Sequence, residues 1–145
     1  MDPDQNTDQN QSQQVAPPTE PSKKIILLIE DDPLLVRMYK DKFENEGFKV
    51  SVSDNGEEGL TLVQNERVDM IILDILMPKL SGLDFLRRLR QNGKTKDIPV
   101  IVLSNLSQRE DQEKALNLGV KEYLLKANLT PSQVVEKIRF HLKTS

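Results

Sequence analysis

A chain of 145 residues with a formal net charge of −3 is long enough for one domain with a hydrophobic core, and its acidity argues against broad binding to nucleic acids or anionic membranes. The lack of cysteine excludes disulfides, thiolate metal sites and cysteine nucleophiles, and the longest apolar runs are far shorter than the roughly 20 residues that span a bilayer. We therefore expect one soluble, cytoplasmic domain whose partners are proteins or small phosphorylated donors.

The beginning of the chain contains almost nothing that a core could bury. Residues 1–22 are mostly Gln, Asn, Asp, Pro, Ser and Thr. A segment with so little hydrophobicity cannot compensate the entropy that folding removes. We predict a disordered tail over residues 1–22 and a folded domain over residues 23–145.

The folded part begins with an apolar strand that ends in acidic residues. Residues 24–29 read KIILLI, a run without alternation that is typical of a strand covered on both faces, and the acids of residues 30–32 follow it. Asp32 before Pro33 is typical of a helix start, with the aspartate as N-cap and the proline at the first helical position. We predict that this helix ends at Gly47. Its expected apolar side consists of Leu35, Met38, Tyr39 and Phe43.

The same alternation of strands and helices continues through the chain. The further predicted elements are a strand over 48–52, a helix from 56 to about 65, a strand over 70–73, a helix that stops at Asn92-Gly93, a strand over 99–103, a helix over about 107–118, a strand over 122–125 and a helix from Pro131. This order predicts an α/β fold: a doubly wound, five-stranded parallel sheet with five helices. Right-handed crossovers bring the carboxyl ends of all the strands to one edge, which is where ligands bind in such sheets.

Polar residues that are far apart in the sequence should meet at this edge, because each of them lies where a predicted strand ends. They are Glu30, Asp31, Asp74, Ser104 and Lys126. Carboxylates gathered at one edge repel each other, and burial would raise their pKa values unless a cation joins them. Mg²⁺ prefers oxygen ligands, which Asp31 and Asp74 can supply as carboxylates and Leu76 as a backbone carbonyl.

The same residues can carry phosphoryl chemistry. A carboxylate can attack phosphorus and form an acyl phosphate, which makes Asp74 the candidate acceptor. Lys126 would compensate charge on the phosphoryl oxygens, and the Ser104 hydroxyl would add a hydrogen bond. The set predicts reversible phosphorylation of Asp74.

Four motifs stand at the ends of the predicted strands: E-D-D-P after the first strand, D-I-L-M-P with Gly82 eight residues past the Asp, Ser104 at the end of the fourth strand, and E-Y-L-L-K at the fifth. In this order they closely resemble the receiver domain of two-component response regulators. The resemblance covers Lys23 to about Leu142 and is of the single-domain type, like the chemotaxis regulator. It implies a flavodoxin-like sheet with strand order 2-1-3-4-5.

The resemblance also implies a role for each residue at the edge. Asp74 would accept phosphate from a sensor histidine kinase or a phosphotransfer protein, and Asp31 with Glu30 beside it would build the Mg²⁺ pocket. Lys126 would contact the phosphoryl group. Ser104 would move towards that group, and Tyr123 would then turn inward and remodel the face formed by the fourth helix, fifth strand and fifth helix.

The expected protein is a switch in a phosphorelay and no classical enzyme, since its chemistry is limited to its own phosphorylation and dephosphorylation. We expect a regulator without a DNA-binding or enzymatic segment after Leu142, and therefore output through contact with an unknown downstream protein. We expect no direct binding of nucleic acid or membrane, and either a monomer or a phosphorylation-dependent dimer.

Three positions depart from the usual pattern of the family. Ala127 follows Lys126 where proline after a cis bond is usual, and since a cis bond to a non-proline residue costs about 3 to 4 kcal/mol, we expect a trans, rearranged loop. Asn105 and Leu76 should flank the path of hydrolytic water and tune the lifetime of the phosphate. Gly59 stands in a helix where alanine is common, at a cost of about 1 kcal/mol.

Three other kinds of protein share part of this pattern. A receiver-like docking module that is never phosphorylated keeps the fold and loses the chemistry. An aspartyl-phosphate hydrolase would need D-x-D-x-T/V after the first strand, and a flavodoxin-like cofactor binder would need a phosphate loop where this chain has three acids. We expect His141 to face solvent or to compensate the dipole of the last helix.

Overall fold

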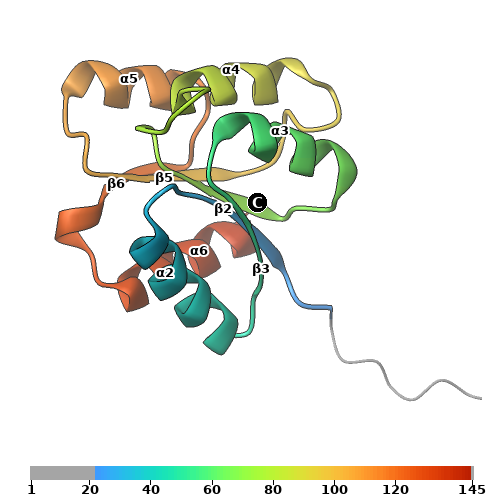
Figure 1. Ribbon diagram of the computed structural model, residues 1–145, viewed down its shortest axis with the longest axis vertical. Coiled ribbons are helices and arrows are strands. Elements are labelled where there is room, and N and C mark those ends of the chain that lie inside the picture. The colour runs from blue at the N-terminus through green and yellow to red at the C-terminus, as the bar shows by residue number, and fades with distance from the viewer. Residues whose placement is uncertain (1–21, 145) are drawn as a thin grey trace, which may run out of the picture.

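The structure is a computed structural model that describes residues 22–144, so all but the last residue of the predicted tail over residues 1–22 lies outside the described residues. Within these residues, five strands alternate with five α-helices and one short 3₁₀ helix (Figure 1). The elements are β2 (Ile25–Ile29), α2 (Pro33–Asn45), β3 (Lys49–Ser53), α3 (Gly56–Asn65), β4 (Met70–Leu73), α4 (Gly82–Gln91), β5 (Val100–Ser104), α5 (Arg109–Asn117), β6 (Glu122–Leu125), η1 (Lys126–Asn128) and α6 (Pro131–Thr144).

The five strands form one parallel sheet in the order β3-β2-β4-β5-β6. Counted from the first strand of the chain, this is the predicted order 2-1-3-4-5, and the doubly wound α/β fold is confirmed. Helices α2 and α6 cover one face of the sheet, and α3, α4 and α5 cover the other (Figure 1). Among residues 22–144, none of the helices has the length and apolar character needed to cross a bilayer.

Each face of the sheet carries its own hydrophobic core, which explains why the inner strands β2, β4 and β5 are apolar runs, whereas the edge strand β3 alternates with polar residues. Strands β4 and β5 are buried at every position. Towards α2 and α6 the core includes Ile26, Leu28, Phe43 and Ile138. Towards the other three helices it includes Leu27, Ile29, Val63, Phe85 and Ala115.

Side-chain caps begin the helices that follow β2, β3 and β4. Asp32 accepts hydrogen bonds from the amides of Leu34 and Leu35, as predicted from the Asp-Pro pair. Asn55 and Ser81 cap α3 and α4 in the same way. Because these caps satisfy otherwise unpaired amides, they fix where each helix leaves the edge of the sheet that holds the candidate site.

Several predicted boundaries were wrong by one or two residues. Strand β3 begins after Phe48 because the Phe48 amide donates to the Phe43 carbonyl at the end of α2, and the ladder starts with the pair of Lys49 and Ile25. Pro99 has no amide hydrogen and serves only as an acceptor for the Ile71 amide, so β5 begins after it. The predicted left-handed cap at Gly47 is confirmed by its φ of 98°, although the last helical residue of α2 is Asn45.

Two further predictions about single residues are wrong: that Met38 belongs to the apolar side of α2, and that His141 faces solvent. The other interpretation of His141, compensation of the helix dipole in the last turn of α6, stays a prediction. Met38 is 40% exposed, so it contributes little to the apolar side of α2. His141 is buried, and its Nε2 lies 2.5 Å from an oxygen of Glu122 on β6, because the last turn of α6 packs against that strand. Lys137 contacts the other Glu122 oxygen at 3.1 Å, so this carboxylate joins β6 to α6.

Gly59 has a packing reason for lacking a side chain. A Cβ atom there would lie 2.7 Å from Cδ1 of Ile29 and 3.2 Å from the Phe85 ring. Distances this short are below van der Waals contact, so alanine at this position would have to displace Ile29. The glycine therefore lets α3 approach β2 closely.

Candidate functional site

Three carboxylates meet at the carboxyl edge of the sheet, as the strand order requires. Glu30 and Asp31 follow β2, and Asp74 follows the neighbouring strand β4. One oxygen from each of the three lies within 4.8 Å of the other two. Glu30 and Asp74 are buried and Asp31 is exposed, so the cluster opens to solvent on the side of Asp31.

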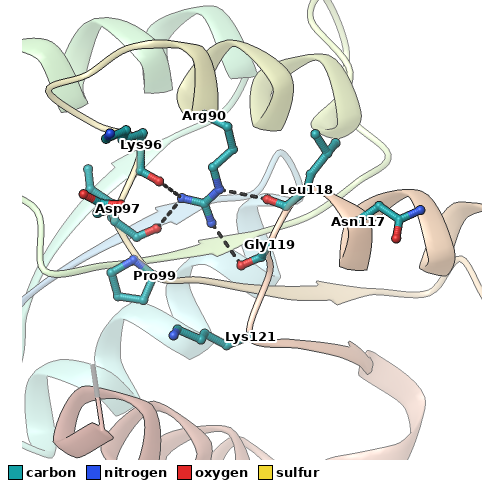
Figure 2. Close-up of a pocket in the computed structure, with 9 residues that line it drawn as sticks. Arg90, Lys96, Asp97, Pro99, Asn117, Leu118, Gly119 and Lys121 are labelled. Carbon is teal, nitrogen blue, oxygen red and sulfur yellow. Dashed lines mark hydrogen bonds between the residues drawn. The ribbon is translucent and has the colours of Figure 1, made fainter.

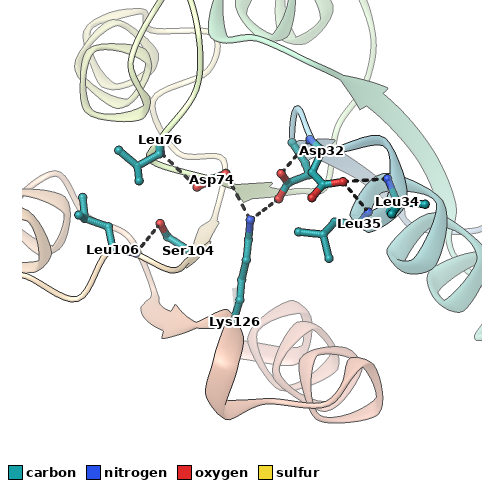
Figure 3. A network of polar contacts seen from close by, with 9 residues as sticks. Asp32, Leu34, Leu35, Asp74, Leu76, Ser104, Leu106 and Lys126 are labelled. Atoms are coloured by element: carbon teal, nitrogen blue, oxygen red, sulfur yellow. Dashed lines mark hydrogen bonds and ion pairs between the residues drawn. The ribbon is translucent and has the colours of Figure 1, made fainter.

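Lys126 is the first residue of η1, and its side chain extends from there to the same cluster of three acids (Figure 3). Its Nζ lies 2.6 Å from Oε1 of Glu30 and 3.3 Å from Oδ2 of Asp74. Burial acts to lower the pKa of Lys126, but the hydrogen bond from Lys126 to Glu30 and the negative charge of Asp74 outweigh it and raise that pKa overall. The ammonium therefore stays charged between the two carboxylates.

Glu30 is held on both of its oxygens. Oε1 contacts Lys126, and Oε2 accepts a hydrogen bond from the Asp32 amide at 3.1 Å. Burial nevertheless raises the pKa of Glu30, because the loss of water outweighs the stabilising effect of these two partners. The sequence assigned Glu30 an indirect role in the metal pocket; its direct contact with Lys126 was not predicted.

Asp74 is fixed through its backbone and through one carboxylate oxygen. Its amide continues the ladder to Ile29 at 3.0 Å, and Oδ1 accepts a hydrogen bond from the Leu76 amide at 3.1 Å. The side chain of Leu76 is 57% exposed beside the site, and Asn105 is also exposed. Their influence on the lifetime of a phosphate stays a prediction.

The loop after β5 links Ser104 to Tyr123 through one residue, Leu106. The Leu106 amide donates to Oγ of the buried Ser104 at 3.1 Å, and the Leu106 carbonyl accepts from the Tyr123 hydroxyl at 2.6 Å. Burial raises the pKa of Tyr123, which keeps its hydroxyl protonated as a donor. Sequence patterns could not reveal Leu106, because both contacts use backbone atoms that every residue possesses.

The position of Lys126 does not depend on a proline after it. The peptide bond between Lys126 and Ala127 is trans, as predicted, and the residues that follow β6 form the short helix η1. The lysine still reaches both carboxylates. The sequence-predicted set of Glu30, Asp31, Asp74 and Lys126 is thus brought together, while Ser104 binds its own loop.

The donor set fits a divalent cation. Three carboxylates and one ammonium leave an excess of two negative charges when all four groups are ionised, and oxygen atoms are the ligands that Mg²⁺ prefers. Asp31 is exposed, so it retains room for water molecules that such an ion keeps. The residues can therefore hold a hard cation next to Asp74.

A second hollow, of about 410 Å³, lies at the opposite edge of the sheet (Figure 2). The guanidinium of Arg90 from α4 donates four hydrogen bonds to backbone carbonyls there, and the acceptors are Lys96, Ile98, Leu118 and Gly119. These bonds tie α4 to the loops before β5 and β6. Because the carbonyls occupy the donors of Arg90, this hollow does not offer a reactive group as the acid cluster does.

Comparison with known proteins identifies one family, the response regulators. The model of the response regulator receiver domain matches residues 26–139. The transcriptional regulatory protein CpxR of Escherichia coli K12 is 38% identical over 120 residues, which are 83% of this chain and 50% of CpxR. The chain thus spans about half the length of this curated relative.

Solved structures agree with this fold. The CheY-like response regulator receiver domain protein of Methanospirillum hungatei JF-1 aligns with a TM-score of 0.80 at 27% identity, covering 85% of this chain and 96% of its own. The receiver domain of sensor histidine kinase PA1611 from Pseudomonas aeruginosa PAO1, with magnesium coordinated in its active site cleft, aligns with a TM-score of 0.77 at 23% identity, covering 84% and 99%. At that identity the second likeness concerns the fold alone.

Proposed function

The chain belongs to the response regulator receiver domain family, and from this premise we propose that it accepts a phosphoryl group on Asp74 from the phosphohistidine of a sensor histidine kinase or phosphotransfer protein. The observation that carries this proposal is the Lys126 ammonium, held 3.3 Å from the Asp74 carboxylate at a nearly buried site. An ordinary aspartate at the end of a strand needs neither a buried cation nor two neighbouring acids.

The transfer would leave the charges and bonds balanced. An oxygen of Asp74 attacks phosphorus, and a P–O bond forms while the P–N bond to the donor imidazole breaks, with its electron pair going to the nitrogen. Lys126 lies where it can compensate charge on the phosphoryl oxygens. The Ser104 hydroxyl accepts a hydrogen bond from the Leu106 amide, so its own hydrogen would be left to donate to the phosphoryl group once Ser104 moves towards it.

Asp31, Asp74 and the backbone carbonyl of Leu76 would hold Mg²⁺, with Glu30 in the pocket beside them. Such an ion supplies two positive charges next to the phosphoryl oxygens. The oxygen donors of the acid cluster support this assignment, as does the magnesium in the active site cleft of the PA1611 receiver domain.

The output would be a change of the α5-β6-α6 face that a downstream protein reads. Tyr123 on β6 and Ser104 at the end of β5 both bind Leu106. A shift of Ser104 would therefore displace Leu106 and with it the hydrogen-bond acceptor of Tyr123. In this function the chain is a cytoplasmic phosphorelay switch, as a monomer or a phosphorylation-dependent dimer. It is not an enzyme, and it binds neither nucleic acid nor membrane directly.

Intact-mass measurement after incubation with acetyl phosphate and Mg²⁺ tests the proposal. We expect the wild-type protein to gain the mass of one phosphoryl group. The Asp74→Asn variant, and wild-type protein treated with a chelator, should gain none. Asp97→Asn is the matched control, because this exposed aspartate lies at the opposite edge of the sheet and should leave labelling unchanged. If the wild type gains no mass under any condition, the acceptor role is wrong and a receiver-like docking module is favoured.

A further inference from the structure

An open groove at the amino edge of the sheet, on the other side of the domain from the acid cluster, combines an apolar floor with basic walls. It has a volume of about 290 Å³ and lies between the ends of α2 and α6. Its lining residues are Lys24, Glu46, Phe48, Arg139, Leu142 and Lys143. This composition suits an apolar side chain with a negative charge beside it.

The positive charge of the groove is not compensated within residues 22–144. Glu46 is the acidic residue among those that line the groove, and its two oxygens already contact Lys42 at 3.0 Å and Arg139 at 2.9 Å. Lys24 and Lys143 form no ion pair with any residue that the structure describes. On a chain whose formal net charge is −3, this local excess of cations favours an acidic ligand.

The floor of the groove is fixed by its own contacts. The guanidinium carbon of Arg139 lies 5.7 Å from the centre of the Phe48 ring. The same guanidinium donates hydrogen bonds to the carbonyl and to the carboxylate of Glu46, each at 2.9 Å. Leu142 packs against the core that contains Phe48. A ligand would therefore meet a preformed surface, which lowers the cost of binding.

The chain itself carries a segment of the required chemistry directly before the groove. Residues 14–21 read QVAPPTEP, in which an apolar run is followed by the acidic Glu20. Residues 1–22 contain acidic residues and no lysine or arginine, so their charge is complementary to that of the groove. Glu20 precedes the groove residue Lys24 by four positions, so only a few residues separate the segment from the groove.

We propose that residues 15–20 dock in this groove. The apolar run then lies against Phe48 and Leu142. Glu20 lies beside Lys143 and compensates its charge. The inference goes beyond the proposed function and does not rest on it, because the groove and the acid cluster lie at opposite edges of the sheet. It revises the prediction of a disordered tail for residues 15–20 alone.

Attachment to the same chain makes a weak affinity sufficient. A segment joined to its site by a few residues meets that site at an effective concentration on the order of millimolar. A Kd of about 1 mM for the separate segment would therefore fill the groove in roughly half of the molecules. Docking would hold the last turn of α6, a helix that belongs to the α5-β6-α6 face.

A spin label on the full chain tests the docking. Because the chain contains no cysteine, Gln14→Cys gives a single site for a nitroxide, whose unpaired electron broadens the NMR signals of nearby groups. Leu142 reports from the groove. Val68 is the matched reporter: its neighbour Arg67 donates to the Lys23 carbonyl at 3.3 Å, but Val68 packs in the core on the other face of the sheet. We expect loss of the Leu142 methyl signals, with those of Val68 retained.

An exchange of charges tests the contact that holds the segment. In the spin-labelled chain, Glu20→Lys and Lys143→Glu should each weaken the broadening at Leu142. The double variant should restore it, because opposite charges then face each other again in reversed order. Lys121→Glu is the matched control, since it makes the same change of charge at the same edge of the sheet but beside the hollow around Arg90, and it should leave the broadening unchanged.

Three results would overturn the proposal. Equal broadening of Leu142 and Val68 would mean that the segment does not select the groove. Charge variants without effect on the broadening would exclude the pairing of Glu20 with Lys143. In a mixture of isotope-labelled wild type and unlabelled spin-labelled chain, loss of the Leu142 signals would show that a second copy fills the groove.

Discussion

Replacing Gly82 with alanine should both destabilise the fold and disturb the site. Gly82 is the first residue of α4 and is buried against the loop that carries Asp74. A Cβ atom there would lie 2.6 Å from the Ile75 Cα and 2.9 Å from the Asp74 carbonyl oxygen. Because both are backbone atoms, no side-chain rotation can relieve the overlap.

The magnitude follows from two opposing effects. Overpacking a core position costs about 1 to 3 kcal/mol, and the upper part of this range applies where backbone must move. Alanine in place of glycine recovers at most about 1 kcal/mol of helix propensity. We therefore expect Gly82→Ala to lower the free energy of unfolding by about 1 to 2 kcal/mol. The displaced Asp74 should also be phosphorylated more slowly.

Urea unfolding and the acetyl phosphate assay measure these two effects. Gly93→Ala is the control, since a Cβ at Gly93 meets nothing within 4 Å and its backbone is not in the left-handed region. The control should be neutral or stabilised by up to about 1 kcal/mol, with unchanged labelling. Equal stability of the two variants would refute the close-contact argument.

The remaining predictions concern groups outside the acid cluster. Arg90→Ala should lower the free energy of unfolding by about 2 to 3 kcal/mol in urea, because four backbone carbonyls lose their donor, whereas exposed Arg88→Ala should change it little. The pKa of Glu122 is lowered in the fold: burial raises it, and the contacts with His141 and Lys137 together lower it by more than that. The stability that comes from this lowered pKa is present above pH 4.5 and is lost as the pH falls below it. A Glu122→Gln variant should therefore be less stable than the wild type at pH 7 by a few tenths to about 1 kcal/mol. Thermal unfolding should show that this difference shrinks in acid. Lys79→Gly should stabilise by up to about 1 kcal/mol in the same measurement, because Lys79 has a φ of 67° that only glycine adopts freely; no gain would argue against strain there.

The outline of the fold could be predicted from local patterns. Apolar runs without alternation are typical of strands covered on both faces, and the Asp32-Pro33 pair places a helix start correctly. Strand boundaries were less certain because they depend on register, which neighbouring strands decide. Phe48 and Pro99 resemble strand residues in the sequence, yet the Phe48 amide bonds to the end of α2 and Pro99 has no amide hydrogen.

Contacts between distant residues could be predicted only in part. The convergence of Glu30, Asp74 and Lys126 followed from parallel topology, because the ends of parallel strands share one edge. Which carboxylate holds the lysine more closely did not follow, since that depends on side-chain reach and on the Asp32 amide that orients Glu30.

His141 shows the same limit from the other side. Its place in the last turn of a helix predicted a solvent-facing or dipole-compensating residue, and only the packing of α6 against β6 brings it to Glu122.

The sequence by itself determined the order of elements, the edge where the acids gather and the chemistry those acids can perform. The tertiary structure alone decided the pairing within that set, because ion pairs and backbone contacts depend on distances in space that local residue patterns do not contain.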